Sequence, residues 1–278
     1  MTKTWCLFTQ AVRPDYLVIV RCWRRTSAMA KPFLLGVLGG MGPLATLDFQ
    51  HKLLDATPAD SDQQQLPSVV WNVPQVADRQ KALAGLGPSP LPQLLLGIEK
   101  LNQAGVSHIV IPCNTAHHWF DELSYASAAP LLHIVDATLE GLVALPQKPQ
   151  RVGLVATQGT LDAGWYQRAL AQKGMEVLLP TADELQQWFV PGCYAVKRGA
   201  LPEGGELLSL QAQALLARGA EQLLLACTEV PLALRAVAAP FLSLTHDPAQ
   251  LLAQRCAEIW LEYRHSYFPH TQSNNWNK

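Results

Sequence analysis

Two stretches of the sequence decide the fold, because each contains the same pattern. Residues 36–53 read GVLGGMGPLATLDFQHKL, and residues 153–170 read GLVATQGTLDAGWYQRAL. In each stretch a short apolar strand is followed by a turn that contains glycine and then by a helix. This alternation is typical of βαβ units, whose strands form a parallel sheet. The sequence therefore predicts an α/β fold that contains two similar units.

A second pair of stretches repeats at nearly the same distance. Residues 101–115 read LNQAGVSHIVIPCNT, and residues 215–229 read LLARGAEQLLLACTE. The glycines that begin the first pair are 153 − 36 = 117 positions apart, and the cysteines of the second pair are 227 − 113 = 114 apart. Two segments that agree this closely indicate a duplicated unit. We predict two pseudo-symmetric lobes, each a mainly parallel sheet flanked by helices, with the active site in the cleft between them.

The repeat also sets the expected boundaries. Helices are predicted over about residues 44–55, 91–103, 162–173, 203–218 and 248–263, and glycines at 105 and 219 stand where helices are expected to stop. Arg21, Arg24 and Arg25 follow the apolar run of residues 16–20 instead of preceding it, which argues against a signal peptide. The predicted parts are an N-terminal extension outside the fold (1–30), lobe 1 (31–138 plus 245–265), lobe 2 (139–244) and a polar tail (266–278).

The composition excludes several classes of partner. The chain has 278 residues, is 49% hydrophobic and only 15% charged, and carries a net charge of −1, so most of it is expected to pack into a core. It lacks the basic stripe that a nucleic-acid surface needs, and its apolar runs are too short to span a membrane. Its six cysteines do not form the pattern of a disulfide framework. They indicate reduced thiols and a cytoplasmic location.

Two of the cysteines occupy matched places in the repeat. Cys113 and Cys227 each follow a predicted strand, at the edge where open parallel sheets bind ligands. Racemisation needs one group that removes a proton from a tetrahedral carbon and a second group that returns a proton on the opposite face. Thiols suit both tasks, because a modest change of environment yields a thiolate near neutral pH. Buried cysteines are also common as small apolar residues, and this structural role is expected of the four cysteines without a matched position, Cys6, Cys22, Cys193 and Cys256.

Four short motifs resemble the aspartate racemase branch of the aspartate/glutamate racemase family. The motifs are GGMGP at residues 39–43, NVPQ at 72–75 with Asp78-Arg79 after it, PCNT at 112–115 and ACTE at 226–229. Glutamate racemases typically carry an aspartate–serine pair in the first of these loops, where this chain has glycines. The resemblance covers about residues 33–263. It implies the racemisation of an acidic amino acid, aspartate or glutamate, by Cys113 and Cys227, without pyridoxal phosphate, metal or nucleotide, in a homodimer.

The resemblance also implies which residues bind the substrate. Arg79 and Lys197 would hold a side-chain carboxylate, although most such residues are solvated surface charges. Hydroxyl, amide and backbone N–H groups beside the two cysteines would hold the α-carboxylate and stabilise the negative charge that develops on it. Tyr166 either lines the cleft or packs within its helix. The full predicted set of binding residues is Met41, Arg79, Asn114, Thr115, Thr157, Thr160, Lys197 and Thr228.

Other functions remain open at this point. Gly40, Gly42 and Ala45 formally satisfy the fingerprint of a dinucleotide-binding oxidoreductase, but the second predicted strand ends in Asn72 instead of an acid that could hold a ribose. Cys113, His117 and His118 could ligate zinc, although no fourth ligand is evident. A non-catalytic two-lobed protein could bind a small molecule in the same cleft. Within the enzymes, related folds isomerise maleate or decarboxylate malonates.

Overall fold

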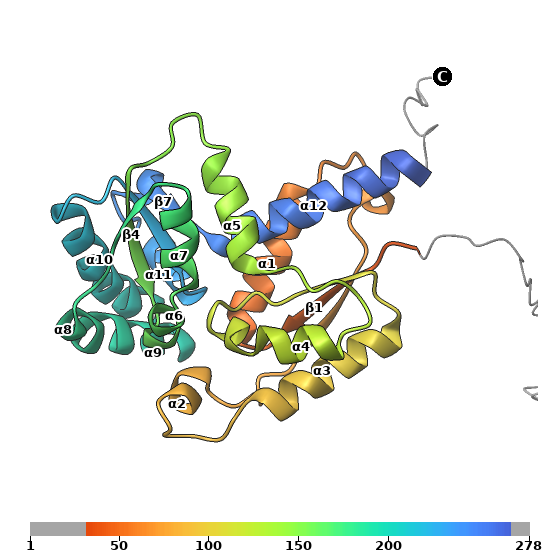
Figure 1. The fold of residues 1–278 in the computed structure, drawn as a ribbon, viewed down its shortest axis with the longest axis horizontal. Coiled ribbons are helices and arrows are strands. Elements are labelled where there is room, and N and C mark those ends of the chain that lie inside the picture. The colour runs from red at the N-terminus through yellow and green to blue at the C-terminus, as the bar shows by residue number, and fades with distance from the viewer. Residues whose placement is uncertain (1–31, 268–278) are drawn as a thin grey trace, which may run out of the picture. The chain divides into compact units, whose positions relative to one another are not determined.

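Two parallel sheets form the framework of the molecule (Figure 1). The structure is a computed structural model, and it describes residues 32–267. The strands are β1 (Leu35–Gly39), β2 (Ser68–Asn72), β3 (His108–Val110), β4 (Arg151–Ala156), β5 (Glu176–Leu178), β6 (Gln222–Ala226) and β7 (Thr245–His246). The order is β2-β1-β3 in the first sheet and β5-β4-β6-β7 in the second, and all neighbouring strands run parallel. The second sheet repeats the order of the first and adds one strand, and the predicted two-lobed α/β fold is confirmed.

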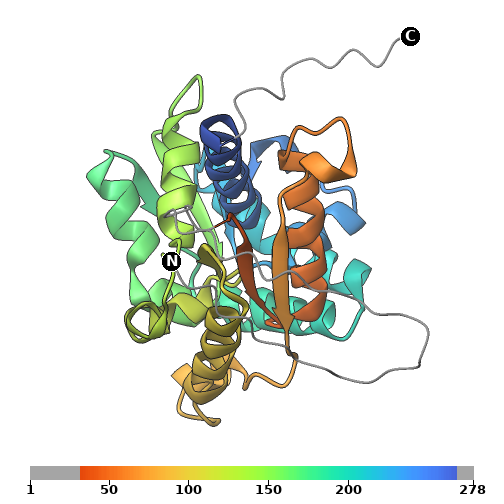
Figure 2. The same ribbon diagram turned by 90° about the vertical axis from the view of Figure 1, so that its right-hand side faces the viewer.

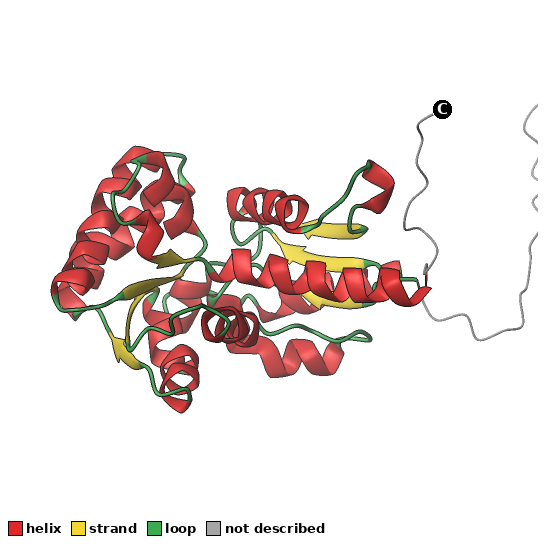
Figure 3. Cartoon of the chain, turned by 90° about the horizontal axis from the view of Figure 1, so that it is seen from above, coloured by secondary structure: helices red, strands yellow, loops and turns green. Residues whose placement is uncertain are grey.

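Helices surround the strands of both sheets (Figure 3). In the first half of the chain they are α1 (Pro43–Ala56), α2 (Arg79–Leu83), α3 (Leu91–Ala104), α4 (Phe120–Ala126) and α5 (Ile134–Val143), with short 3₁₀ turns η1 (Asp62–Gln64) and η2 (Thr115–Trp119). In the second half they are α6 (Gln158–Ala163), α7 (Trp165–Gln172), α8 (Ala182–Glu184), the π-helical turn η3 (Leu185–Phe189), α9 (Val190–Lys197), α10 (Leu201–Ala217), α11 (Glu229–Ala236), the 3₁₀ turn η4 (Leu242–Leu244) and α12 (Pro248–Tyr267).

Prolines and glycines set several helix ends. α1 begins at Pro43, whose missing N–H costs nothing in a first helical turn. α3 ends before Gly105, which adopts the left-handed conformation with φ of +74° as its cap. The single helix predicted over residues 162–173 is wrong. Gly164, with φ of +67°, ends α6 and precedes α7, because a left-handed residue interrupts a right-handed helix.

The two sheets share one apolar core. Alternate residues of a strand face opposite sides of its sheet, so Val37 of β1 packs with α1 and α12, and Leu38 packs with α3. Figure 2 shows these three helices around the first sheet. Leu154 of β4 belongs to the same cluster as Val37, and so does Leu252 of α12. The opposite face of the second sheet packs against α9 and α10. The shared cluster therefore joins the two halves.

Two predicted lobe boundaries fall elsewhere in the structure. The boundary at 138/139 lies within α5, which is a continuous helix. Residues 245–246 were assigned to lobe 1, but they form β7, which hydrogen-bonds to β6 in the second sheet. The N-terminal extension (1–30) and the tail beyond residue 267 lie outside the described residues. Among the helices that are described, none is long and apolar enough to cross a membrane.

Candidate active site

A cavity lies where strand ends of the two sheets come together. It holds about 300 Å³ of empty space, part of which is open to solvent. Met41 reaches it from the loop after β1, and Thr157 from the residue after β4. Such carboxyl ends are where open parallel sheets bind ligands. Nine of the ten predicted site residues line this cavity, namely Met41, Arg79, Cys113, Asn114, Thr115, Thr157, Lys197, Cys227 and Thr228.

Cys227 is buried among polar groups. Its side chain is 5% exposed, and its Sγ donates a hydrogen bond to Oε2 of Glu229 at 3.1 Å. The Sγ of Cys193 lies 3.9 Å away on the other side. The hydrogen bond with Cys193, burial and the negative charge of Glu229 raise the pKa of Cys227 well above its ordinary value. Cys227 is therefore held as a thiol at neutral pH.

The sequence reasoning missed three residues of this cavity, Gln80, Cys193 and Glu229. Cys193 was expected to be structural because the repeat gives it no counterpart; it packs in the core of the second half and also lines the cavity. It lies on α9 four positions before Lys197, and residues four apart share one face of a helix. Since Lys197 was a predicted site residue, this spacing was the available signal. Glu229 follows Thr228 directly, and its carboxylate accepts hydrogen bonds from both Cys227 and Thr228.

Cys113 has different neighbours. It is 6% exposed, and its carbonyl oxygen lies 2.9 Å from Nδ1 of His117. The backbone N–H of Ile134 donates to Nε2 of the same ring at 3.2 Å. Both ring nitrogens of His117 are thus engaged by the backbone, and burial together with His133 lowers the pKa of His117 to about 3. His118 is exposed, so the geometry does not favour the zinc site considered for Cys113, His117 and His118.

Two cations reach the cavity from different halves of the chain. Nη1 of Arg79 donates to the carbonyl oxygens of Val76 and Ala77, and its buried Nε has no hydrogen-bond partner. Lys197 lies 3.8 Å from the Asp78 carboxylate, and although burial opposes the charge, the negative charge that Cys193, Glu229 and Cys227 carry when ionised raises the pKa of Lys197. Lys197 is therefore held as a cation beside two carboxylates and two thiols, whereas Arg79 retains an unused donor.

Asp78 positions both of these cations. Its Oδ1 accepts from the backbone N–H groups of Gln80 and Lys81 and so caps α2, the helix that begins with Arg79. Its Oδ2 accepts from the hydroxyl of Tyr194 at 3.0 Å. Although burial opposes it, these hydrogen bonds and the charge of Lys197 lower the pKa of Asp78. The helix α2 packs against α6 of the second half, which brings Arg79 toward the opposite lobe.

Asn114 presents an unused donor beside Cys113. Its Oδ1 accepts a hydrogen bond of 2.6 Å from the hydroxyl of Tyr166, and its buried Nδ2 has no partner. Burial of Tyr166 raises the pKa of that phenol, so the hydroxyl stays a donor. Of the two roles considered for Tyr166, helix packing describes it better, because it is buried and does not line the cavity. Its hydroxyl orients the side chain of Asn114, which lines the cavity.

Three threonine hydroxyls link the two halves beside the cavity. Oγ1 of Thr115 lies 2.9 Å from Oγ1 of Thr157, which in turn donates to Oγ1 of Thr160 at 3.0 Å. Thr160 is fully buried behind Thr157, and the prediction that it lines the cavity differs from the structure in this respect. Its hydroxyl instead accepts a hydrogen bond from Thr157, which does line the cavity.

The glycines of the first loop have structural roles. Gly40 has φ of +92°, and a Cβ there would lie 2.3 Å from the carbonyl oxygen of Val73. The backbone N–H of Gly40 already donates to Oγ1 of Thr46. Close packing and an internal hydrogen bond therefore explain why residue 40 is glycine, whereas in a dinucleotide-binding fingerprint a glycine allows the backbone to approach the phosphates.

A second cavity adjoins the first. It holds about 740 Å³ of empty space and shares Arg79, Lys197 and Glu229 with the first cavity. Most of its other walls are apolar, formed by residues such as Leu44 and Leu232. The charged side chains thus stand between a small polar cavity and a larger, more apolar one.

Comparisons with known proteins agree with the motifs. The sequence profile of the family described as Asp/Glu/Hydantoin racemase matches residues 38–256. The structure resembles the aspartate racemase of Picrophilus torridus with a TM-score of 0.72 and 28% identity, over 84% of this chain and 98% of that one. The fold is also that of the glutamate racemase of Campylobacter jejuni, with a TM-score of 0.56 and 22% identity over 83% of this chain and 86% of that one.

A curated relative matches part of the chain. The broad specificity amino-acid racemase RacX of Bacillus subtilis (strain 168) is 30% identical over 152 residues, which are 52% of this chain and 63% of that protein. The matched stretch is therefore shorter than two thirds of the relative. The resemblance inferred from the four motifs is confirmed by the family profile.

Proposed function

Because the chain belongs to the Asp/Glu/Hydantoin racemase family, we propose that it racemises an acidic amino acid without a cofactor, with Cys113 and Cys227 as the two acid–base residues. One observation carries the proposal. The two thiols come from equivalent places in the repeat and line a single cavity that also contains Arg79 and Lys197. A dinucleotide-binding or purely binding role would require neither thiol.

The proton moves between the two cysteines by way of the substrate. One thiolate removes the α-proton from its face of the α-carbon, and the other thiol donates a proton to the opposite face. The raised pKa of Cys227 suits it to donate first. When the reaction runs in reverse, Cys227 must act as the base, and the nearby ammonium of Lys197 then stabilises its thiolate.

The unused donors of the cavity match the two carboxylates of an acidic substrate. The Nδ2 of Asn114 lacks a partner beside Cys113 and is available to the α-carboxylate, with Thr115 and Thr228. These donors would stabilise the negative charge that builds on that carboxylate as the α-proton leaves. The free Nε of Arg79 is available to the side-chain carboxylate, which Lys197 would also attract.

Aspartate is the substrate we propose first. The relative from Picrophilus torridus is named an aspartate racemase, and its match extends over most of both chains. Glutamate comes second, because glutamate racemases share the fold. Because one relative is named a broad specificity amino-acid racemase, neutral amino acids are tested as well. We further propose a homodimer, which sedimentation would test, and a cytoplasmic location.

Incubation in D₂O tests the function most directly. The full chain is dialysed against a chelator and incubated without added cofactor with L-aspartate, L-glutamate or a neutral amino acid, followed by chiral separation and mass measurement. We expect the D-enantiomer of an acidic amino acid to appear with one deuterium at the α-carbon. Enantiomer formation without deuterium would contradict exchange through thiols, and no conversion of any amino acid would overturn the proposal.

A further inference from the structure

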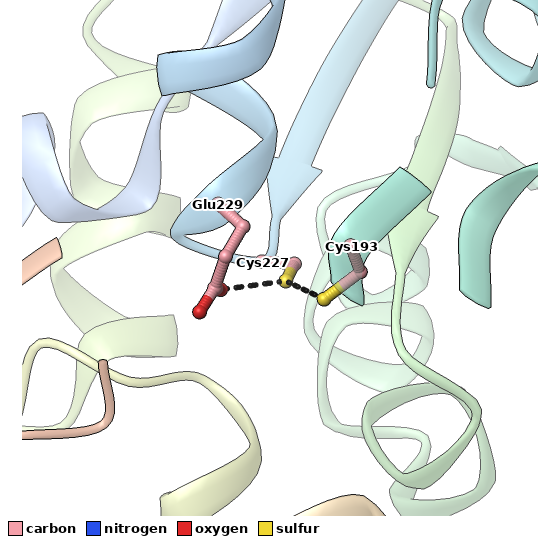
Figure 4. A group of neighbouring side chains, drawn as sticks. All are labelled: Cys193, Cys227 and Glu229. Atoms are coloured by element: carbon pink, nitrogen blue, oxygen red, sulfur yellow. Dashed lines mark hydrogen bonds between the residues drawn. The ribbon is translucent and has the colours of Figure 1, made fainter. Parts of the chain in front are cut away.

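Three potential metal ligands lie together on one wall of the cavity. Figure 4 shows the Sγ of Cys227 between the Sγ of Cys193 and the carboxylate of Glu229. The ligand atoms of the three side chains all lie within 4.8 Å of one another, and all three side chains are buried. Among the residues that the structure describes, this is the group able to hold a metal ion. It differs from the zinc site considered from the sequence, which used Cys113.

The spacing of these atoms fits a tetrahedral ion. Zn–S bonds of about 2.3 Å and Zn–O bonds of about 2.0–2.2 Å place two sulfurs about 3.8 Å apart and a sulfur and an oxygen about 3.5 Å apart. The two Sγ atoms here are 3.9 Å apart, and Sγ of Cys227 lies 3.1 Å from Oε2 of Glu229. The Sγ of Cys193 and the ligand oxygen of Glu229 lie within 4.8 Å of each other, so this third pair would close by up to about 1.3 Å, with shifts of a few tenths of an ångström in the other two pairs, to place the three atoms at three corners of a zinc site.

The charges of the site also balance. Coordination removes the thiol protons of Cys193 and Cys227, which leave to solvent, and with the carboxylate of Glu229 the ligands then carry three negative charges. A Zn²⁺ ion supplies two positive charges, and Lys197, close enough to sense all three ligands, supplies the third, while Arg79 offsets the charge of Asp78, which also pairs with Lys197. A buried cluster without net charge avoids the penalty of an unpaired charge. Thiolates also favour zinc over hard ions such as Mg²⁺.

We propose that Cys193, Cys227 and Glu229 form a Zn²⁺ site, and that zinc bound there inactivates the enzyme. All three ligands also line the substrate cavity, so the fourth ligand of the ion would come from that cavity. The sulfur of Cys227 cannot hold zinc and exchange a proton at the same time. The inactivation rests on the proposed function of Cys227, whereas the metal site does not.

Cobalt substitution reports on the site without any assay of activity. We would titrate the reduced full chain with Co²⁺, with Cys6 and Cys22 replaced by serine so that only thiols of described residues contribute. We expect one equivalent per chain, with visible bands of tetrahedral cobalt and near-ultraviolet thiolate-to-cobalt charge transfer. The substitutions Cys193→Ser and Glu229→Gln should each weaken binding at least about tenfold, as loss of a ligand costs no less than loss of the groups that orient ligands. Cys256→Ala removes a buried thiol of α12 and should leave the spectrum unchanged.

The outcomes separate the two parts of the proposal. A cobalt spectrum without charge transfer, or one that is the same in Cys193→Ser and Glu229→Gln variants of native circular dichroism, would overturn the metal site. Inhibition of racemisation by Zn²⁺ at the affinity found by competition with cobalt, reversed by a chelator, would support the inactivation. Full activity of the zinc-saturated protein would overturn it. If the protein binds the metal but racemises no amino acid, the proposed metal site would stand and the proposed function would be rejected.

Discussion

Cys113 and Cys227 occupy equivalent places in the repeat, yet their surroundings differ. Cys113 lies beside a neutral imidazole and an amide, because its carbonyl oxygen contacts His117 and its neighbour is Asn114. Cys227 lies between a second thiol and a carboxylate, with an ammonium close by. The duplication thus provides two thiols at matched strand ends, while the side chains around them differ between the two halves. Pseudo-symmetry explains the pair, and the departures from it raise the pKa of Cys227.

The largest effect expected is the loss of either thiol. Cys113→Ser and Cys227→Ser should each lower racemisation by about 10³-fold or more, because each turnover needs abstraction on one face and donation on the other. Each variant retains one thiol and should still exchange the α-hydrogen of one enantiomer with deuterium, without inversion. The two variants should prefer opposite enantiomers, as measured by mass and chiral separation.

The double variant provides the control for that experiment. It should lose exchange with both enantiomers, and its loss of racemisation should be far smaller than the product of the single losses, because both residues serve one reaction. A single variant that racemises at close to the rate of the unmodified protein would reject the two-thiol mechanism.

A smaller effect is expected from the loss of Arg79, whose buried Nε has no hydrogen-bond partner. Arg79→Ala removes a charge-assisted hydrogen bond, which is worth about 1.5–3 kcal/mol, so kcat/KM for aspartate should fall by about ten- to a hundredfold. The kcat/KM of this variant for a neutral amino acid should change little. Lys81→Ala, an exposed charge on the same short helix, is the matched control and should have no effect. Equal losses on acidic and neutral substrates would give Arg79 a structural role.

The fold was largely predictable because its signals are local. The glycine and cysteine offsets indicated the duplication, and the strand order of the two sheets repeats accordingly. The wrong helix over residues 162–173 depends on the conformation of Gly164, since an isolated glycine is compatible with either a continuous or a broken helix. The lobe boundary at 245 failed because β7 is only two residues long, too short to show an alternating pattern.

The site was less predictable where it depends on contacts between distant segments. The sequence indicated nine residues that line the cavity, seven of them in the four motifs, but Cys193, on the same helix as Lys197, lies outside every motif. Its contact with Cys227 joins residues that are 34 positions apart. The burial of Thr160 likewise follows from packing that its neighbours in sequence do not reveal. The motifs identified residue types, and tertiary packing supplied the neighbours that raise the pKa of Cys227.

The smallest effect tests whether Cys193 acts on the acid strength of Cys227. The chemical equilibrium constant of a racemisation is one, so kcat/KM is the same for both enantiomers at every pH. Its profile should be bell-shaped, with an alkaline limb where the enzyme loses the last proton shared by the two thiols. Cys193 raises the pKa of Cys227 through a hydrogen bond and through its charge. A group with a raised pKa keeps its proton to higher pH, so Cys193→Ser should lower that pKa and move the alkaline limb to lower pH, while activity near neutrality changes little. The profiles are measured with a chelator present to exclude metal, and Cys256→Ala should leave both limbs in place. If Cys193→Ser changed the height of the profile and moved neither limb, Cys193 would serve packing alone, and the difference between the two thiols would have to come from Glu229.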